Sequence, residues 1–142
     1  AVNRPNTRAF NCALVGKTYK EPTVPITFSH ALSKIVIDEI GNKSAIENVH
    51  IVDVEATTLT KILDEVQPKQ IDFFSLDVEG FELEVLNGLD FEKYRPRFML
   101  IECLDEDKKK IMDTFLKGDY ECIDKLSDRD YLYAALLNGS SC

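Results

Sequence analysis

Residues 71–88 read IDFFSLDVEGFELEVLNG and indicate the fold of the chain. Of the first six residues only Asp72 is charged, and the rest are mostly apolar or aromatic, which predicts a strand covered on both faces over 71–77. The apolar residues that follow recur at a helical spacing and predict a helix over 80–88. Residues 77–80 therefore form a corner at which a buried strand turns directly into a helix.

The corner carries side chains suited to a binding or catalytic site. Asp77 is expected at the carboxyl end of the strand, where open α/β sheets bind their ligands, and Glu79 follows it closely. Gly80 has no Cβ, so a ligand or a neighbouring backbone can come close. An alternative is that Asp77 only caps the next helix. Glu82 and Glu84 are expected to be surface acids favoured by the helix dipole.

The rest of the chain alternates strands with helices. Strands are expected at residues 8–15, 49–54, 71–77, 97–103, 119–124 and 130–136, helices at 58–66, 80–88 and 106–117, and an irregular or hairpin segment at 24–38. This alternation predicts a three-layer α/β sheet, and 142 residues suit one domain.

Composition excludes some classes of function. The chain has 25 acidic and 17 basic residues and a net charge of −8, which makes nucleic acid a poor partner because phosphate binding needs clustered Lys and Arg. No stretch approaches the roughly 18 apolar residues of a membrane span, and the N-terminus lacks the apolar stretch of a signal peptide. We therefore expect a soluble, cytoplasmic protein.

The four cysteines give no metal site from their spacing. They form no C-x-x-C pair and have no histidine nearby in sequence. Cys12, Cys103 and Cys122 lie in strand-like runs and are expected to be small buried residues, and free thiols of this kind fit a reducing compartment.

Four blocks of the sequence resemble one family. The stretch LDVEGFELEVLNG at residues 76–88 resembles the D-x-E-G-x-E-x-x-x-L-x-G signature of the FkbM-type methyltransferases. Three further blocks follow the order of that family: residues 57–63 resemble its T-L-D-D-L-L helix, residues 95–102 its P-x-x-x-x-x-E strand, and residues 8–14 its N-A-A-L strand. The resemblance runs from about residue 8 to about residue 135.

This resemblance implies a Rossmann-like, S-adenosylmethionine-dependent methyltransferase domain. In the family, a strand with a glycine-rich loop holds the methionine and ribose of the cofactor, whereas the six glycines here contain no G-x-G pair. The resemblance therefore implies that residues 1–142 are the C-terminal portion of an FkbM-like domain, with an N-terminally incomplete sheet. It also implies that residues 8–15 and 71–77 are not neighbours, since two strands of the family sheet lie between them.

The resemblance assigns roles to particular residues. It implies that Asp77 orients the methyl acceptor or removes its proton, with Glu79 in support. It places Asn11, Ala13 and Leu14 near the adenine of the cofactor.

Substrate contacts and metal binding complete the expected site. Glu102, which ends the block of residues 95–102, and His30, in a segment that could reach the crevice, are the candidates for substrate binding. No metal site is assigned, because two acids without a matched third ligand are weak evidence.

The predicted function is methyl transfer, by the full-length domain, to a hydroxyl oxygen of a small molecule or sugar. The alternative is a non-catalytic module, or half of a split enzyme that acts only with a complementing N-terminal half; a homo-oligomer is a further option. A metal-dependent hydrolase built on Asp77, Glu79 and Glu102 has less support, because no histidine is placed to join them.

Overall fold

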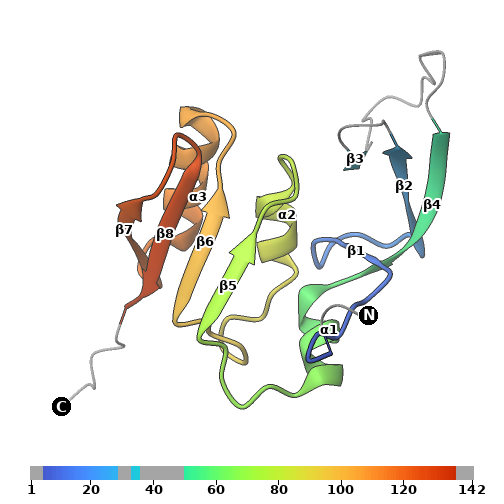
Figure 1. Cartoon of the computed structure of the whole chain (residues 1–142), viewed down its shortest axis with the longest axis horizontal. Helices are drawn as coiled ribbons and strands as arrows, with labels where there is room; N and C mark the ends of the chain where they lie inside the picture. The colour runs from blue at the N-terminus through green and yellow to red at the C-terminus, as the bar shows by residue number, and fades with distance from the viewer. Residues whose placement is uncertain (1–4, 29–32, 36–49, 137–142) are drawn as a thin grey trace.

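The computed structural model describes residues 5–28, 33–35 and 50–136, and it is a mixed α/β structure with two sheets (Figure 1). The elements in chain order are β1 (Ala13–Leu14), β2 (Thr23–Phe28), β3 (Ser33–Ile35), β4 (His50–Thr57), α1 (Leu59–Val66), β5 (Phe73–Leu76), α2 (Glu82–Asn87), β6 (Phe98–Glu102), α3 (Glu106–Leu116), β7 (Tyr120–Lys125) and β8 (Asp130–Ala135).

The first sheet has the strand order β1-β4-β2-β3. β1 runs parallel to β4, with Ala13 opposite Ala56, and β2 is antiparallel to both β4 and β3. Its small core consists of Ala13, Val15 and Val24. The expected hairpin segment at 24–38 is confirmed for its described residues by the pairing of β2 with β3.

The second sheet has the order β5-β6-β8-β7. β5 and β6 are parallel, as a strand–helix–strand unit requires, while β8 is antiparallel to both β6 and β7. A β-bulge interrupts the pairing of β7 between Cys122 and Asp124. Within the described residues β5 is an edge strand, because it pairs with β6 alone.

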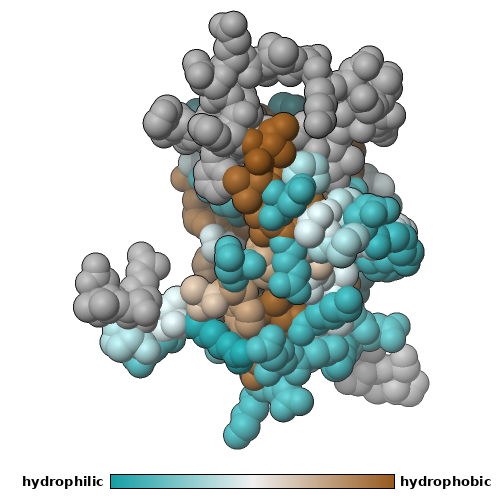
Figure 2. Space-filling view, turned by 90° about the vertical axis from the view of Figure 1, so that its right-hand side faces the viewer, coloured by the Kyte–Doolittle hydropathy of each residue, from teal (hydrophilic) through white to brown (hydrophobic). Residues whose placement is uncertain are grey.

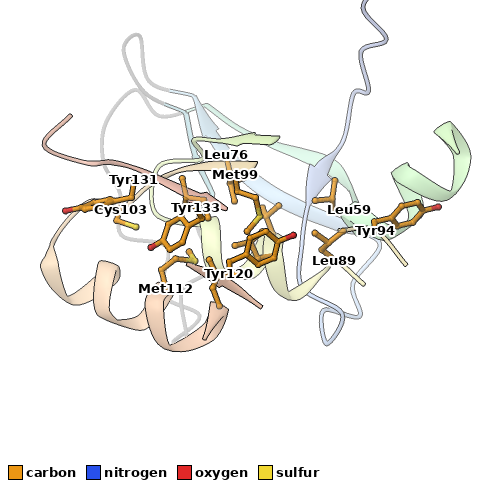
Figure 3. Close-up of a cluster of buried hydrophobic side chains, with 14 residues drawn as sticks. Leu59, Leu76, Leu89, Tyr94, Met99, Cys103, Met112, Tyr120, Tyr131 and Tyr133 are labelled. Atoms are coloured by element: carbon orange, nitrogen blue, oxygen red, sulfur yellow. The ribbon is translucent and has the colours of Figure 1, made fainter. Parts of the chain in front are cut away.

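The main core lies between one face of the second sheet and the helices α2 and α3 (Figure 3). Met99 and Ile101 of β6 and Tyr133 of β8 are almost completely buried on this face. They pack with Leu86 of α2 and Met112 of α3. Burial of a large apolar side chain contributes about 1.5–3 kcal/mol, so this face stabilises the second sheet.

The opposite face of the second sheet is not covered by any helix or strand in the described part of the chain. Phe73 of β5 is 55% exposed and Phe98 of β6 is 38% exposed, while Leu100 of β6 is half-buried. The prediction of a strand covered on both faces is therefore wrong for the described residues. Phe74 and Leu76 of β5 pack in the core beneath α2 and α3, whereas Phe73 and Ser75 lie on the uncovered face.

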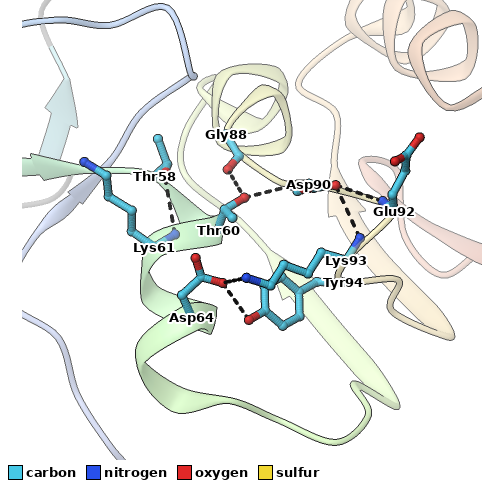
Figure 4. A network of polar contacts seen from close by, with 9 residues as sticks. All are labelled: Thr58, Thr60, Lys61, Asp64, Gly88, Asp90, Glu92, Lys93 and Tyr94. Carbon is cyan, nitrogen blue, oxygen red and sulfur yellow. Dashed lines mark hydrogen bonds and ion pairs between the residues drawn. The ribbon is translucent and has the colours of Figure 1, made fainter.

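A polar network joins α1 to the end of α2 (Figure 4). The Thr60 hydroxyl donates to the Gly88 carbonyl at 2.8 Å and accepts the Asp90 N–H at 2.8 Å. Asp64 accepts hydrogen bonds from the Lys93 ammonium and the Tyr94 hydroxyl. These bonds fix α1 beside the loop between α2 and β6.

The two sheets meet at α2. Phe81 packs against both hydrophobic cores. At the other end of α2, a Cβ added to Gly88 would lie 2.3 Å from the Val15 carbonyl oxygen. The chain that follows β1 therefore approaches α2 so closely that only glycine fits at residue 88.

Most expected elements agree with the structure. β1 is much shorter than the predicted strand at 8–15, because only Ala13 and Leu14 pair with β4. β1 belongs to the first sheet. It does not pair with β5, in agreement with the family strand order, which implied that the two strands are not neighbours.

The expected burial of three cysteines is only partly correct. Cys103 on the helix-covered side of the sheet is buried and Cys12 is half-buried. Cys122 is exposed, since β7 is an edge strand.

The surface beside β4 is mixed in polarity. Figure 2 views the molecule from the side on which β4 lies in Figure 1, and hydrophobic and hydrophilic side chains are both visible there. Ile51 and Val52 of β4 are the large hydrophobic residues of this sheet that are exposed among those described. No helix in the described ranges is long and apolar enough to cross a membrane.

Candidate active site

The corner between β5 and α2 has a specific backbone conformation. β5 ends at Leu76, and Asp77 follows at the carboxyl end of the strand with its side chain exposed. Glu79 has a φ of 55° and Gly80 a φ of 100°. Successive positive φ values are costly for residues with a side chain, so Glu79 is held in a conformation that few non-glycine residues adopt. Residues around the corner must therefore stabilise this backbone conformation.

Glu82 holds this corner from inside the protein. Its side-chain Oε1 accepts hydrogen bonds from the backbone N–H groups of Val78 at 3.1 Å and Gly80 at 3.0 Å, and the residue is only 4% exposed. The expectation that Glu82 is a surface acid is wrong. Its carboxylate supplies the acceptor that the N–H groups of this tight corner lack.

The sequence contained one signal for this role. Glu82 stands two residues after Gly80, where a first-turn carboxylate can reach back to the corner. The alternative role of Asp77 as the helix cap is not observed, because the N-cap is Phe81 and no side chain caps it.

Glu102 ends β6 beside the corner. Its side chain is 15% exposed, its Oε1 lies 3.8 Å from Nη1 of Arg129, and its Oε2 is buried without a hydrogen-bond partner among the described residues. Burial is the largest cause that raises the pKa of the Glu102 carboxyl, and Arg129 opposes it. Three nearby carboxylates raise this pKa further: Asp77, Glu79 and Glu82.

The structure thus brings Asp77, Glu79 and Glu102 together at the carboxyl ends of two neighbouring parallel strands, β5 and β6. Acids placed this close interact unfavourably when all are charged, which favours the neutral form of the most buried one. An acidic group of this kind can accept a proton, orient a hydroxyl group or attract a cation.

A small pocket adjoins Glu102. Its volume is about 40 Å³, and its lining residues are Gly80, Glu82, Leu83, Glu102, Cys103, Lys108, Ile111 and Met112. This is room for a few water molecules, at roughly 10–15 Å³ each, and not for a nucleoside.

The residues predicted near the adenine lie on and before β1. Asn11 is exposed, whereas Ala13 is buried in the core of the first sheet and Leu14 is half-buried against the main core. Ala13 and Leu14 belong to a strand of the first sheet, whereas Asp77 and Glu102 lie at the ends of strands of the second sheet. His30, the other substrate-binding candidate, lies outside the described residues.

No group of three or more His, Cys, Asp or Glu residues is arranged to hold a metal ion in the ranges that the structure describes.

Comparison with known proteins identifies the class of domain. The chain matches the family model of the methyltransferase FkbM domain over residues 2–133. The chain therefore belongs to the FkbM methyltransferase domain family. A search of curated proteins found no match, and neither did a search of solved structures.

Proposed function

We propose that this chain takes part in S-adenosylmethionine-dependent transfer of a methyl group to a hydroxyl oxygen of a small molecule or sugar. The observation that carries the proposal is the position of Asp77, exposed at the carboxyl end of β5 on a corner that Glu82 holds in place. Membership of the FkbM family supports the reaction class.

The chemistry asks for a proton acceptor beside an aligned hydroxyl group. A bond forms between the hydroxyl oxygen and the methyl carbon as the carbon–sulfur bond breaks, and the hydroxyl proton passes to a carboxylate. Asp77 is the proposed acceptor of this proton, with Glu79 in support. Glu102 is proposed to orient the substrate, and His30 is retained as a proposed substrate contact.

The cofactor itself is S-adenosylmethionine in this proposal, which supplies an electrophilic methyl group when bound. Asn11, Ala13 and Leu14 are proposed to lie near its adenine. The pocket beside Glu102 is too small for the cofactor, and the sequence has no G-x-G pair. We therefore propose that a complementing segment, or a further copy in a homo-oligomer, completes a three-layer Rossmann-like domain and the cofactor site.

Transfer of a labelled methyl group tests the proposal. The protein, in the assembled form in which it occurs, is incubated with radiolabelled S-adenosylmethionine and a panel of hydroxyl-containing acceptors. Label should appear in an acceptor and should be lost in the Asp77→Asn variant. Absence of both cofactor binding and transfer would contradict the proposal.

The second candidate is a non-catalytic module of the same family. The lack of a glycine-rich loop and the small pocket favour it. Calorimetric titration of the 142-residue chain with S-adenosylhomocysteine separates the candidates. Micromolar binding by the chain alone would exclude the non-catalytic module.

A further inference from the structure

The turn between β7 and β8 holds Arg129 beside the candidate active site. The Leu126 N–H donates to the Asp130 carbonyl at 2.9 Å and closes the turn. The Ser127 hydroxyl oxygen accepts the N–H groups of Arg129 at 3.2 Å and of Asp130 at 3.1 Å. The Arg129 carbonyl accepts the Cys103 N–H at 2.8 Å, directly after β6. These bonds fix the backbone of Arg129 at the end of β6 and leave its side chain free for another role.

The Arg129 guanidinium faces the acids at this end of the sheet. Its Nη1 atom lies 3.8 Å from Glu102 Oε1, and the side chains of Arg129 and Glu102 are 58% and 15% exposed. In the described part of the chain, no other lysine or arginine nitrogen lies within 4.0 Å of an oxygen of four carboxylates: Asp77, Glu79, Glu82 and Glu102. Arg129 is therefore the closest described cation to this acidic group.

Opposing effects decide whether Glu102 is charged. Burial is the largest cause that raises the pKa of its carboxyl group, and its Oε2 atom has no hydrogen-bond partner among the described residues. Three carboxylates raise this pKa further: Asp77, Glu79 and Glu82. Arg129 lowers it, and Lys108 of α3 is a second cation that lines the adjoining pocket. Loss of the Arg129 charge would therefore leave burial and the three acids with less opposition.

We propose that Arg129 is a positioning residue of the candidate active site, which keeps the Glu102 carboxylate charged and fixed at the end of β6. Leu76 is opposite Ile101 in the parallel pair of β5 and β6. Asp77 and Glu102 are the next residues, and they leave adjacent strands about 4.8 Å apart. A charged carboxylate only accepts hydrogen bonds, so Arg129 makes Glu102 an acceptor for a second hydroxyl group of the substrate, beside the one at Asp77. This role rests on the proposed function, in which Glu102 orients the substrate.

Titration of Glu102 by NMR tests the proposal on the full chain. The protein carries glutamate labelled with ¹³C at the side-chain carboxyl carbon, and the Glu102 signal is the one absent from the Glu102→Gln variant. In Arg129→Gln, the pKa of Glu102 should be higher than in the unmodified protein. Arg129→Lys keeps the positive charge and should recover most of the difference. High salt should reduce the difference, because Arg129 is exposed and its charge is screened.

A second arginine of the same sheet provides the matched control. Arg97 is also exposed and also pairs with a carboxylate, since its Nη1 atom lies 3.3 Å from Asp72 Oδ1. These two residues directly precede β6 and β5, at the opposite end of the strands from Glu102. Arg97→Gln removes the same charge from the chain and should leave the titration of Glu102 unchanged.

The pH profile of methyl transfer shows whether this charge matters to the site. In Arg129→Gln, transfer by the assembled protein should fall about two- to fivefold on the acid side of the profile, the factor that a partly exposed ion pair supports. On the alkaline side Glu102 is charged in both proteins, so transfer should be equal. A merely structural role of Arg129 would lower transfer at every pH.

Three results would overturn the proposal. The first is a Glu102 titration that is the same in Arg129→Gln and in the unmodified protein, and the second is an equal shift in Arg97→Gln. The third is a loss of transfer in Arg129→Gln that does not vary with pH. The NMR titration needs neither cofactor nor substrate, so absence of methyl transfer by the unmodified protein would contradict the proposed function while the titration still decides the role of Arg129.

Discussion

The Glu82 carboxylate and the backbone N–H of Gly80 lie 3.0 Å apart, with Glu82 buried beneath the corner that carries Asp77. The same carboxylate oxygen accepts the Val78 N–H. A hydrogen bond to a charged acceptor is stronger than one between neutral groups, and each also prevents a buried donor from being left unpaired. Glu82 therefore stabilises the backbone on which the candidate catalytic acids lie.

Removal of the Glu82 carboxylate should destabilise the corner between β5 and α2. Glu82→Ala leaves two backbone donors without an acceptor and should lower the free energy of unfolding by about 1–3 kcal/mol, measured by urea denaturation. Glu82→Gln keeps the side-chain oxygen and should recover most of this loss. Equal stability of the Ala variant and the unmodified protein would show that the corner does not need this acceptor.

Asp77→Asn should separate catalysis from stability. Asp77 is exposed and accepts no hydrogen bond within the described residues, so the variant should unfold at the same urea concentration as the unmodified protein. Methyl transfer should fall by about 100-fold or more if Asp77 accepts the proton. Asp107→Asn, an exposed acid on α3, is the control with unchanged activity. A large loss of stability with normal turnover would mean that Asp77 has a structural role.

Gly88→Ala should destabilise the junction between the sheets. The new Cβ would lie 2.3 Å from the Val15 carbonyl oxygen, so the backbone after β1 or α2 must shift. We expect a loss of about 1–3 kcal/mol in urea denaturation. Gly118→Asn is the control, because no atom lies within 4 Å of a Cβ there and asparagine tolerates positive φ. If Gly88→Ala and Gly118→Asn have the same free energy of unfolding, the backbone around residue 88 has room for a Cβ.

Glu102 should make stability depend on pH. Its pKa is raised in the folded protein, chiefly by burial, so its contribution is most favourable below the pKa of the unfolded chain and is lost as pH rises through the folded pKa. Glu102→Gln should therefore raise the melting temperature at pH 7, by about 2–4 °C for each kcal/mol gained, with little effect near pH 4. Equal effects at the two pH values would contradict this assignment.

Thiol labelling should distinguish the cysteines. Cys103 is 3% exposed, and burial raises the pKa of its thiol to about 11, so it should not react with iodoacetamide at pH 8 in the folded protein. Cys122 is exposed on the edge strand β7 and should react readily. Mass spectrometry of peptides from the labelled protein checks both statements, with urea-unfolded protein as the fully reactive control. Rapid labelling of Cys103 would show that the sheet opens locally at β6.

Local signals in the sequence predicted most of the elements. Asp105 stands directly before α3, and its carboxylate accepts the Lys108 N–H at 2.8 Å. Thr58 likewise caps α1, and Gly118 adopts a φ of 91° after α3. These features depend on residues close together in sequence, which is why a single sequence is sufficient to predict them.

Features that depend on distant residues could not be predicted in this way. Leu100 and Phe98 are as hydrophobic as buried residues, yet their face lacks a covering layer among the described residues. The burial of Glu82 depends on how α2 packs against the sheet, which helical periodicity does not report. The roles of Asn11, Ala13 and Leu14 near a cofactor remain predictions, because their positions on and before β1 do not test them.

The two edge strands of the second sheet, β5 and β7, differ in how readily a further strand can pair with them. The bulge in β7 breaks the regular spacing of its backbone groups, and its acids repel an incoming strand of like charge. β5 has neither a bulge nor a charge between Phe73 and Leu76. Pairing with a further strand is therefore favoured beside β5, next to the end that carries Asp77. A strand added there would form one wall of the candidate active site and leave the β7 edge unchanged.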